Sequence, residues 1–367
     1  MIPPSFYSLY FCIFAPVALF FILYGMTGVA PLIAAIYLLL RQGNAFAPDV
    51  TPPLALRRWA ASFFAASALG HVWWYLFYVY SNDIHSVSYA VVGVIDTFGM
   101  LTTIAGTLLA MLQDRKRPVW PLFAALPPYV VTCVLFVVYD HDYLLYLAIG
   151  YILLLYAVFT VYMVFAVRRY GRWLNDNYAD LENKKVWLSQ VVALVCLLLF
   201  ILYTLVNSDS VLLYILHFIE LVLFSLLLWR VETLPELPSA PVPVKEKIPI
   251  NIDLAQIEQL LEERCAAKQL YLKYDLSLQQ LAQALGTNRS YLSHYFSRQG
   301  ITYNTYINNL RINYFISRYQ EVASAQLSFT VQQLAYESGY RSYSTFSLAF
   351  KQRTGQSVTA WMHQSTD

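Results

Sequence analysis

Two similar ten-residue segments occur in the last third of the chain, 53 residues apart. Residues 277–286 read SLQQLAQALG and residues 330–339 read TVQQLAYESG. Each copy opens with a hydroxyl residue, has glutamine three positions later and closes with glycine, which is the pattern of a capping box at a helix start and a glycine at its end. Arg289-Ser-Tyr and Arg341-Ser-Tyr then begin a second helical segment after each glycine. The repeat therefore predicts two helix-turn-helix units.

Apolar residues at helical spacing predict a small core for each unit. The first core is expected from Leu281, Leu285, Leu292 and Phe296, and the second from Leu334, Tyr340, Phe346 and Phe350. The small residues Ala282 and Ala335 allow a close helix crossing. A helix over 303–319, with Tyr306, Ile307, Leu310, Tyr314 and Ile316 as contacts, is expected to join the units, and residues 251–274 form an additional helical segment. Two second helices held about 34 Å apart can enter successive major grooves on one face of DNA.

Everything before residue 231 has the composition of a membrane protein. The whole chain is 58% hydrophobic and only 13% charged, whereas soluble domains are about one quarter charged. A spanning helix needs roughly 20 mainly apolar residues. Such stretches occur at 58–80, 88–112, 118–139, 143–167, 186–206 and 211–229, with one or two more inside 6–40, where Pro16, Gly25, Gly28 and Pro31 could break a helix.

The loop charges predict how these spans are oriented. Lys and Arg gather at 41–58, 113–117 and 168–185, and the intervening loops 81–87, 140–142 and 207–210 contain none. Positive loops stay on the cytoplasmic side of a membrane. The tail after Arg230 therefore lies in the cytoplasm, whether the bundle has seven spans, which we favour, or eight. The expected fold is all-α: a seven-helix, possibly eight-helix, transmembrane bundle (1–230), a proline-rich linker (231–250) and a soluble tandem helix-turn-helix domain (251–367).

The tail carries a motif set that can be compared with a known family. Leu334-Ala335, Gly339-Tyr340, Phe346, Phe350-Lys351, Gly355 and Ser357 occur in order after the first unit. With two such units joined by a helix, residues 251–367 resemble the DNA-binding domain of AraC/XylS-family transcription regulators. The chain departs from the family pattern at Val358, where proline is usual, and at Trp361, where tyrosine is common.

The resemblance implies which residues face DNA. In the first unit it implies base contacts by Ser290, Ser293 and His294, with Arg289 and Arg298 toward phosphate. In the second it implies base contacts by Tyr343, Ser344 and Ser347, an apolar contact by Leu348 to a thymine methyl group, and backbone contacts by Arg341 and Lys351. It also implies double-stranded promoter DNA as partner and, as in many family members, a possible homodimer. The net charge of +2 alone would not predict nucleic-acid binding.

Four ionisable residues lie inside the predicted spans: His71, Asp96, His217 and Glu220. Such residues are costly in a membrane and are candidates for sensing a ligand or a proton, with helix packing as the alternative role. His217 and Glu220 lie three residues apart, so they share a helix face and could pair. The sequence contains no catalytic motif, no cysteine or histidine spacing typical of a metal site, and no cofactor motif.

These features predict a bacterial transcription regulator in the inner (cytoplasmic) membrane, with the lipid bilayer and an unknown signal ligand as partners. The bundle would act on the tail through dimerisation, release of the tail, or occlusion of the recognition helices, and the sequence does not distinguish these. One alternative is a transporter or other membrane protein whose tail serves only as a nucleoid or protein anchor. Another is a tail that binds RNA or protein.

Overall fold

The chain is helical wherever its structure is described. The computed structural model describes residues 4–41, 43–45, 47–48, 50–81, 83, 86–203, 210–237 and 254–366, and within these ranges it contains helices and no strand. The chain divides into two compact units. Unit 1 comprises residues 1–168 and 186–239, and unit 2 comprises residues 169–185 and 240–367. The all-α expectation is confirmed for the described residues.

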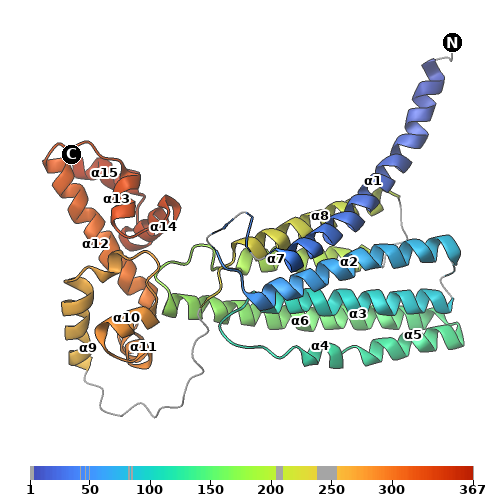
Figure 1. Cartoon of the computed structure of the whole chain (residues 1–367), viewed down its shortest axis with the longest axis horizontal. Coiled ribbons are helices and arrows are strands. Elements are labelled where there is room, and N and C mark those ends of the chain that lie inside the picture. Colours follow the sequence, from blue (N-terminus) through green and yellow to red (C-terminus); the bar gives the residue numbers. More distant parts are fainter. Residues whose placement is uncertain are drawn as a thin grey trace. The chain divides into compact units, whose positions relative to one another are not determined.

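Unit 1 is a bundle of long apolar helices that run alongside one another (Figure 1). Helix α2 packs against α1, α3 and α8, while α3 also contacts α5 and α7 contacts α8. The buried rings of Phe63 and Phe64 from α2 meet Phe224 from α8 in the core. The helices are α1 (Pro4–Leu40), α2 (Leu54–Tyr80), α3 (Val87–Ala110), α4 (Trp120–Ala124), α5 (Pro127–Tyr139), α6 (Asp142–Asn177), α7 (Trp187–Tyr203) and α8 (Ser210–Thr233).

Five segments of unit 1 are long and apolar enough to cross a membrane: Ala18–Leu40, Val87–Ala110, Trp120–Tyr139, Asp142–Asn177 and Tyr214–Thr233. Length and apolarity alone therefore identify five candidate membrane spans among the described residues, fewer than the seven expected. The apolar helix Trp187–Leu202 is shorter. The 27-residue α2 is not one of the five, and its second half holds His71 and two tryptophans.

Some helix boundaries in this half differ from those expected. The expected span 118–139 is present as the apolar segment Trp120–Tyr139, which is divided into α4 and α5 because Pro127 and Pro128 lack the backbone N–H groups that would continue a single helix. The expected loop 168–185 begins as helix, since α6 continues to Asn177. The proline-rich linker 231–250 begins later, because α8 continues to Thr233 and stops before Pro235. Residues 238–250 of that linker lie outside the described part of the chain.

The long first helix has no break. Pro16, Gly25, Gly28 and Pro31 all lie within the continuous helix α1, although 6–40 was expected to allow either one span or two. A continuous helix is consistent with the seven-span reading.

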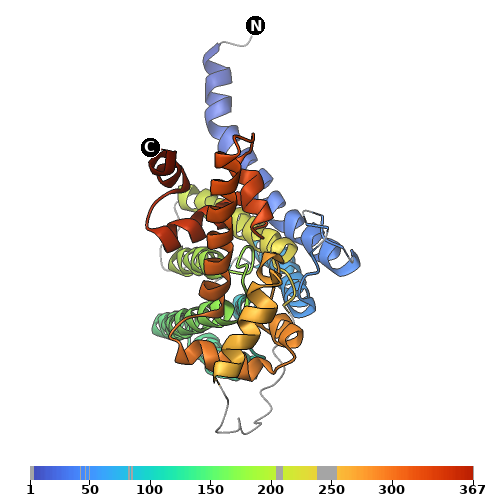
Figure 2. The same cartoon turned by 90° about the vertical axis from the view of Figure 1, so that its left-hand side faces the viewer.

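Unit 2 contains the two predicted helix-turn-helix pairs at opposite ends of the long helix α12 (Tyr303–Ser324), the orange pair near one end and the red pair near the other (Figure 2). The first pair is α10 (Leu278–Leu285) and α11 (Arg289–Arg298), and the second is α13 (Val331–Glu337) and α14 (Tyr343–Thr354). The remaining elements are α9 (Leu254–Leu260), the π-helix η1 (Leu261–Ala266), the 3₁₀ helix η2 (Leu270–Leu272) and α15 (Val358–Thr366).

Each helix-turn-helix pair has its own core, as expected. All eight predicted core residues are buried, and so are Ala282 and Ala335. Helix α12 contributes Tyr303 and Ile307 to the first core, and Ile312, Phe315, Tyr319 and Val322 to the second. The last helix begins at Val358, which is buried, so the missing proline does not prevent it from forming.

Candidate functional site

The first recognition helix, α11, is positioned by well-defined caps. The Ser277 hydroxyl accepts from the Gln280 backbone, and the Gln280 side chain accepts from the Ser277 backbone, which completes the predicted capping box at the start of α10. Gly286 ends α10 at φ 72°, in the left-handed region that favours glycine. The Asn288 side chain then accepts from the Ser290 backbone N–H and starts α11.

The second recognition helix, α14, follows a turn at residues 338–342, which is longer than the turn at 286–288 before α11. The Thr330 hydroxyl accepts from the Gln333 backbone, but the Gln333 side chain donates to Glu337, so only one half of the predicted second capping box is recorded. Gly339 has φ 84°, and a Cβ atom at this position would lie 2.6 Å from the carbonyl oxygen of Leu272. Glycine is therefore required here both for backbone conformation and for close approach. Ser342 caps α14.

The residues expected to read bases lie on the surface of these two helices. On α11, Ser290, Ser293 and Arg298 are exposed and His294 is half-buried. On α14, Tyr343, Ser344, Leu348 and Lys351 are exposed and Ser347 is half-buried, while Arg341 is exposed just before the helix. Leu348 is 53% exposed although it is apolar. This is the distribution required of residues that contact an external partner.

A segment far away in the sequence covers the start of both recognition helices. Arg289, the first residue of α11, donates from Nε and Nη2 to Asn177 Oδ1 at 3.0 and 2.5 Å. At the start of α14, Ser342 Oγ and Thr345 Oγ1 donate to Glu182 Oε2 at 2.6 and 3.1 Å. Partial burial lowers the pKa of Arg289. The roles of Asn177 and Glu182 were not predicted, because only the positive charge of the expected loop 168–185 was visible in the sequence.

The same segment, residues 169–185, is built into the framework of unit 2. Tyr178 forms an antiparallel bridge with Ser277, and the Ala179 N–H donates to the Leu276 carbonyl at 3.2 Å. Asn304 of α12 donates to the carbonyls of Tyr178 and Ala179 at 3.0 and 2.7 Å. Ala179 is buried in the first core. Further contacts are the ion pair between Lys184 and Asp275 and the turn in which Asp180, whose pKa is raised by burial, accepts from the Glu182 N–H.

A buried arginine on α12 joins the two ends of unit 2. Arg311 is 1% exposed and donates to the carbonyl oxygens of Tyr271, Lys273 and Tyr274. Its guanidinium also lies over the ring of Tyr340, 5.4 Å from the ring centre. Burial lowers the pKa of Arg311. This role was not predicted, because the apolar periodicity of α12 indicates only its apolar core residues and Arg311 is charged.

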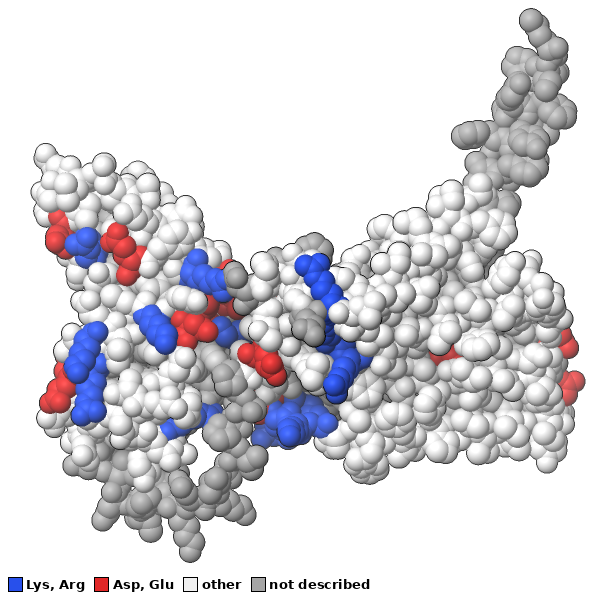
Figure 3. Space-filling view, in the orientation of Figure 1, with Lys and Arg blue, Asp and Glu red and all other residues white. Residues whose placement is uncertain are grey.

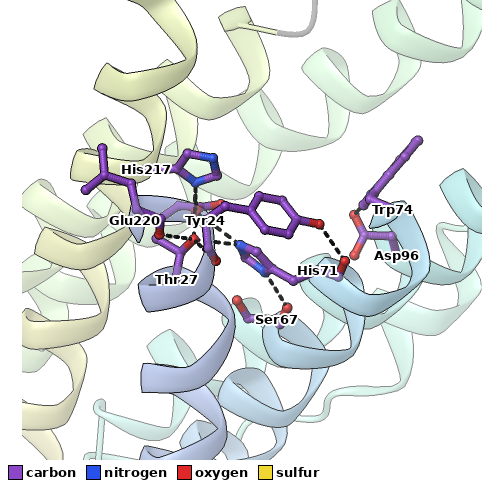
Figure 4. Close-up of polar contacts among 9 residues, drawn as sticks. Tyr24, Thr27, Ser67, His71, Trp74, Asp96, His217 and Glu220 are labelled. Carbon is purple, nitrogen blue, oxygen red and sulfur yellow. Dashed lines mark hydrogen bonds and ion pairs between the residues drawn. The ribbon is translucent and has the colours of Figure 1, made fainter. Parts of the chain in front are cut away.

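A separate polar cluster lies inside unit 1 (Figure 4). His217 Nδ1 and Glu220 Oε2 are 3.1 Å apart, as expected for a pair on one face of α8. His71 of α2 joins them, with Nε2 3.7 Å from Glu220 Oε2. Thr27 of α1, which the sequence analysis did not single out, places its hydroxyl 2.9 Å from His71 Nε2 and 3.2 Å from His217 Nδ1.

Asp96 makes a different set of contacts from the other three predicted intramembrane residues. Its Oδ2 accepts from Trp74 Nε1 at 3.0 Å, between α2 and α3 (Figure 4). The four candidates therefore form one three-residue cluster and one separate carboxylate. Tyr24 of α1 lies beside the cluster, where its hydroxyl donates to the His71 carbonyl at 2.6 Å and its ring contacts both histidines.

Comparison with known proteins supports the reading of unit 2. Residues 281–364 match the family described as "Helix-turn-helix domain", of AraC type, which agrees with the two helix pairs in the structure. No curated protein and no solved structure matches the chain. The chain thus contains a helix-turn-helix domain of the class that binds double-stranded DNA in transcription regulation, and that class is typically not enzymatic.

Proposed function

We propose that this chain is a membrane-tethered, sequence-specific transcription regulator. The observation that carries the proposal is the arrangement of unit 2, in which two helix-turn-helix pairs with exposed recognition helices are joined by the single helix α12. The N-terminal part of a recognition helix is the part that contacts base edges in the major groove. Two such helices on a common framework can read two successive stretches of one promoter.

The tethering is supported by composition and charge. Five segments of unit 1 are long and apolar enough to span a bilayer, and seven crossings are proposed when α2 and α7 are included. On the face of unit 1 drawn in Figure 3, Lys and Arg lie at one end of the bundle and acidic residues at the opposite end. Positive loops mark the cytoplasmic side. These observations support a multi-pass protein of the bacterial inner membrane with its C-terminal domain in the cytoplasm.

The base and phosphate contacts are proposed residue by residue. Ser290, Ser293, His294, Tyr343, Ser344, Ser347 and Leu348 would face base edges, and Arg289, Arg298, Arg341 and Lys351 would face phosphates. Their surface positions on or beside α11 and α14 support this assignment. His71, Asp96, His217 and Glu220 are proposed as the intramembrane residues that respond to a signal, because ionisable groups in a membrane interior are costly and commonly functional.

The test is a selection of bound duplexes by the full chain in lipid nanodiscs from a random pool, followed by a salt titration. The expected result is a two-part motif whose halves are separated by about one helical turn, with affinity that falls as salt rises. Equal binding to scrambled duplexes would contradict sequence-specific regulation. It would favour a tail that serves as an anchor or binds another kind of partner.

A further inference from the structure

We propose that His71, His217 and Glu220 form a binding site for a divalent transition-metal ion, of which Zn²⁺ is the representative. The proposal goes beyond DNA binding and does not depend on it. It would give the predicted intramembrane sensing residues a ligand of defined chemistry. The three side chains come from α2 and α8, and their potential ligand atoms all lie within 4.8 Å of one another.

The spacing of these atoms suits a small metal ion. Zn²⁺ binds imidazole nitrogen and carboxylate oxygen at about 2.0–2.1 Å, so tetrahedral ligand atoms lie roughly 3.3 Å apart. His217 Nδ1 and His71 Nε2 lie 3.1 and 3.7 Å from Glu220 Oε2. Two histidines with one glutamate are a common set of three protein ligands for zinc. Thr27 Oγ1, at 2.9 and 3.2 Å from the two ring nitrogens, is the nearest additional oxygen.

The hydrogen bond on the other side of the His71 ring favours metal binding. His71 Nδ1 lies 2.9 Å from the Ser67 carbonyl oxygen, which can only accept a hydrogen bond. In a neutral ring the proton therefore sits on Nδ1, and Nε2 presents its lone pair toward Glu220. A backbone carbonyl that holds the second nitrogen of a histidine is the usual way in which a metal-ligating imidazole is oriented.

The electrostatics of the cluster call for a cation. A lone pair on His71 Nε2 and the Glu220 carboxylate face each other at 3.7 Å, and both are acceptors. His71, His217 and Glu220 side chains are only 12%, 6% and 13% exposed. Among the described residues, the ion pairs recorded for Glu220 are with these histidines alone. The two acceptors therefore need a proton, on a histidine or on the Glu220 carboxyl, or a bound cation between them, and the converging ligand atoms favour the cation.

The test is metal binding by the full chain in detergent or nanodiscs, with Zn²⁺ alone measured by elemental analysis and Co²⁺ alone by its visible absorption. One ion per chain is expected, with the intense absorption of a low-coordinate Co²⁺ site. Glu220→Gln and His71→Gln should each weaken binding at least tenfold, because a second-sphere or ligand change at a metal site has effects of about this size. Glu236→Gln removes an exposed carboxylate from unit 1 outside the cluster and should bind as the wild type does.

Melting curves separate loss of the site from loss of the fold. Zn²⁺ should raise the melting temperature of the wild type and of Glu236→Gln, and leave that of the two cluster variants unchanged. Absence of stoichiometric Zn²⁺ in the wild type, or equal binding by Glu220→Gln, would overturn the proposal and leave a proton-sharing cluster in its place. Either result is independent of the duplex selection, so it would not affect the assignment of DNA binding.

A second inference rests on different residues, those of the segment 169–185. We infer that this segment competes with DNA for the start of both recognition helices, and the inference rests on the proposed DNA binding. The Asn177 side-chain oxygen accepts hydrogen bonds from the Arg289 guanidinium. The Glu182 carboxylate accepts hydrogen bonds from Ser342 and Thr345 at the N-terminus of α14. DNA phosphates bind at the same kind of place, because helix N-termini offer free N–H groups and a positive dipole end. The carboxylate thus stands where a phosphate would bind.

The segment is also continuous with the two helices α6 and α7. It is held to unit 2 by the contacts of Tyr178 and Ala179 with Leu276, Ser277 and Asn304. Movement at the ends of α6 and α7 would therefore reach the recognition helices directly, without release of the tail or a change of oligomeric state. The sequence left three ways for the bundle to act on the tail: dimerisation, release of the tail and occlusion of the recognition helices. The contacts of residues 169–185 with α11 and α14 favour occlusion.

The test is the affinity of full-length chain in nanodiscs for its selected duplex. Glu182→Gln should bind roughly tenfold more tightly than the wild type, because it weakens two hydrogen bonds to a charged acceptor that DNA must replace. Glu321→Gln is the matched control: it removes the same charge from α12, where Glu321 pairs with Arg318, and should change affinity much less. Unchanged or weaker binding by Glu182→Gln would overturn the inference.

Hydrogen exchange distinguishes displacement of the segment from a general effect of removing a negative charge. Adding the selected duplex to the wild type should increase amide exchange at 177–182 while protecting α11 and α14. If exchange at 177–182 stays constant or slows, the segment is a permanent part of the domain and does not compete with DNA. If the wild type binds no duplex at all, the DNA-binding assignment itself fails, which is a separate result.

Discussion

At the residue scale, the fold of unit 2 depends on a few positions that tolerate only one type of residue. Arg311 satisfies three backbone carbonyls and lies over Tyr340. Gly339 lets the turn before α14 approach the backbone of Leu272. A buried charge with its hydrogen bonds complete is costly to break even where it contributes little net stability. Substitutions at Arg311 and Gly339 should therefore destabilise unit 2 far more than substitutions of the exposed residues on α11 and α14.

Replacing Arg311 tests this directly. Arg311→Met should lower the free energy of unfolding of unit 2 by about 3–5 kcal/mol, because three carbonyls lose a charged donor in a buried place. The measurement is hydrogen exchange in α10–α14 as a function of urea. Arg318→Met on the same helix is the control, because its exposed ion pair with Glu321 should contribute little to stability. Equal effects of the two changes would refute the role of Arg311.

The two turn glycines should differ in a predictable way. Both have positive φ, so Gly286→Ala should cost about 1–2 kcal/mol from backbone strain alone. Gly339→Ala should cost clearly more, since the new Cβ would also lie 2.6 Å from the Leu272 oxygen, whereas at Gly286 the nearest atom is 3.4 Å away on the flexible Arg264 side chain. Thermal unfolding of the two variants compares them. A smaller effect at 339 would contradict the close approach.

At the element scale, α11 and α14 are the parts that the sequence predicted best. Their caps, glycines and small cores are local features, and local features leave a pattern in the sequence. The segment 169–185 could not be predicted in the same way. Asn177 and Glu182 each accept two hydrogen bonds from partners more than one hundred residues away, and such contacts leave no periodicity in the sequence. The His71 contact with Glu220 is equally long-range, whereas the His217–Glu220 pair on one helix was predicted.

Substitutions on the recognition helices should separate base reading from phosphate contact. Ser347→Ala in α14 should change which bases are preferred at one position, with little effect on the salt dependence. Arg298→Ala at the end of α11 should weaken binding to all sequences alike and reduce the salt slope by about 1. Selections at two salt concentrations measure both. An unchanged motif for Ser347→Ala would show that this face of α14 does not read DNA.

At the scale of the whole molecule, we propose a membrane bundle followed by a cytoplasmic DNA-binding domain, with the positive loops on the cytoplasmic side. Unit 1 has apolar helices, and Lys and Arg gather at one end of it (Figure 3). A membrane-tethered regulator, as proposed, would meet DNA only where the chromosome approaches the membrane. The positive loops and the helix-turn-helix match are independent observations, and both favour a cytoplasmic tail, because a domain of this class is typically cytoplasmic.

Single introduced cysteines test the topology. A membrane-impermeant maleimide should label His141→Cys in intact cells, because residues 140–142 form a loop without Lys or Arg. Lys116→Cys, in the exposed positive loop, should react only after the cells are permeabilised. The chain's described native cysteines, Cys133, Cys196 and Cys265, are buried and provide a low background. Labelling of both sites in intact cells would contradict the proposed orientation.

The most direct test of the whole account is to sequence the DNA that stays bound to isolated membranes. Inner membranes from cells that make the chain are treated with nuclease, and the protected fragments are recovered. The account predicts a small set of fragments that share a two-part motif and disappear when residues 251–367 are deleted. Recovery of random fragments, or the same fragments after that deletion, would contradict a membrane-tethered regulator.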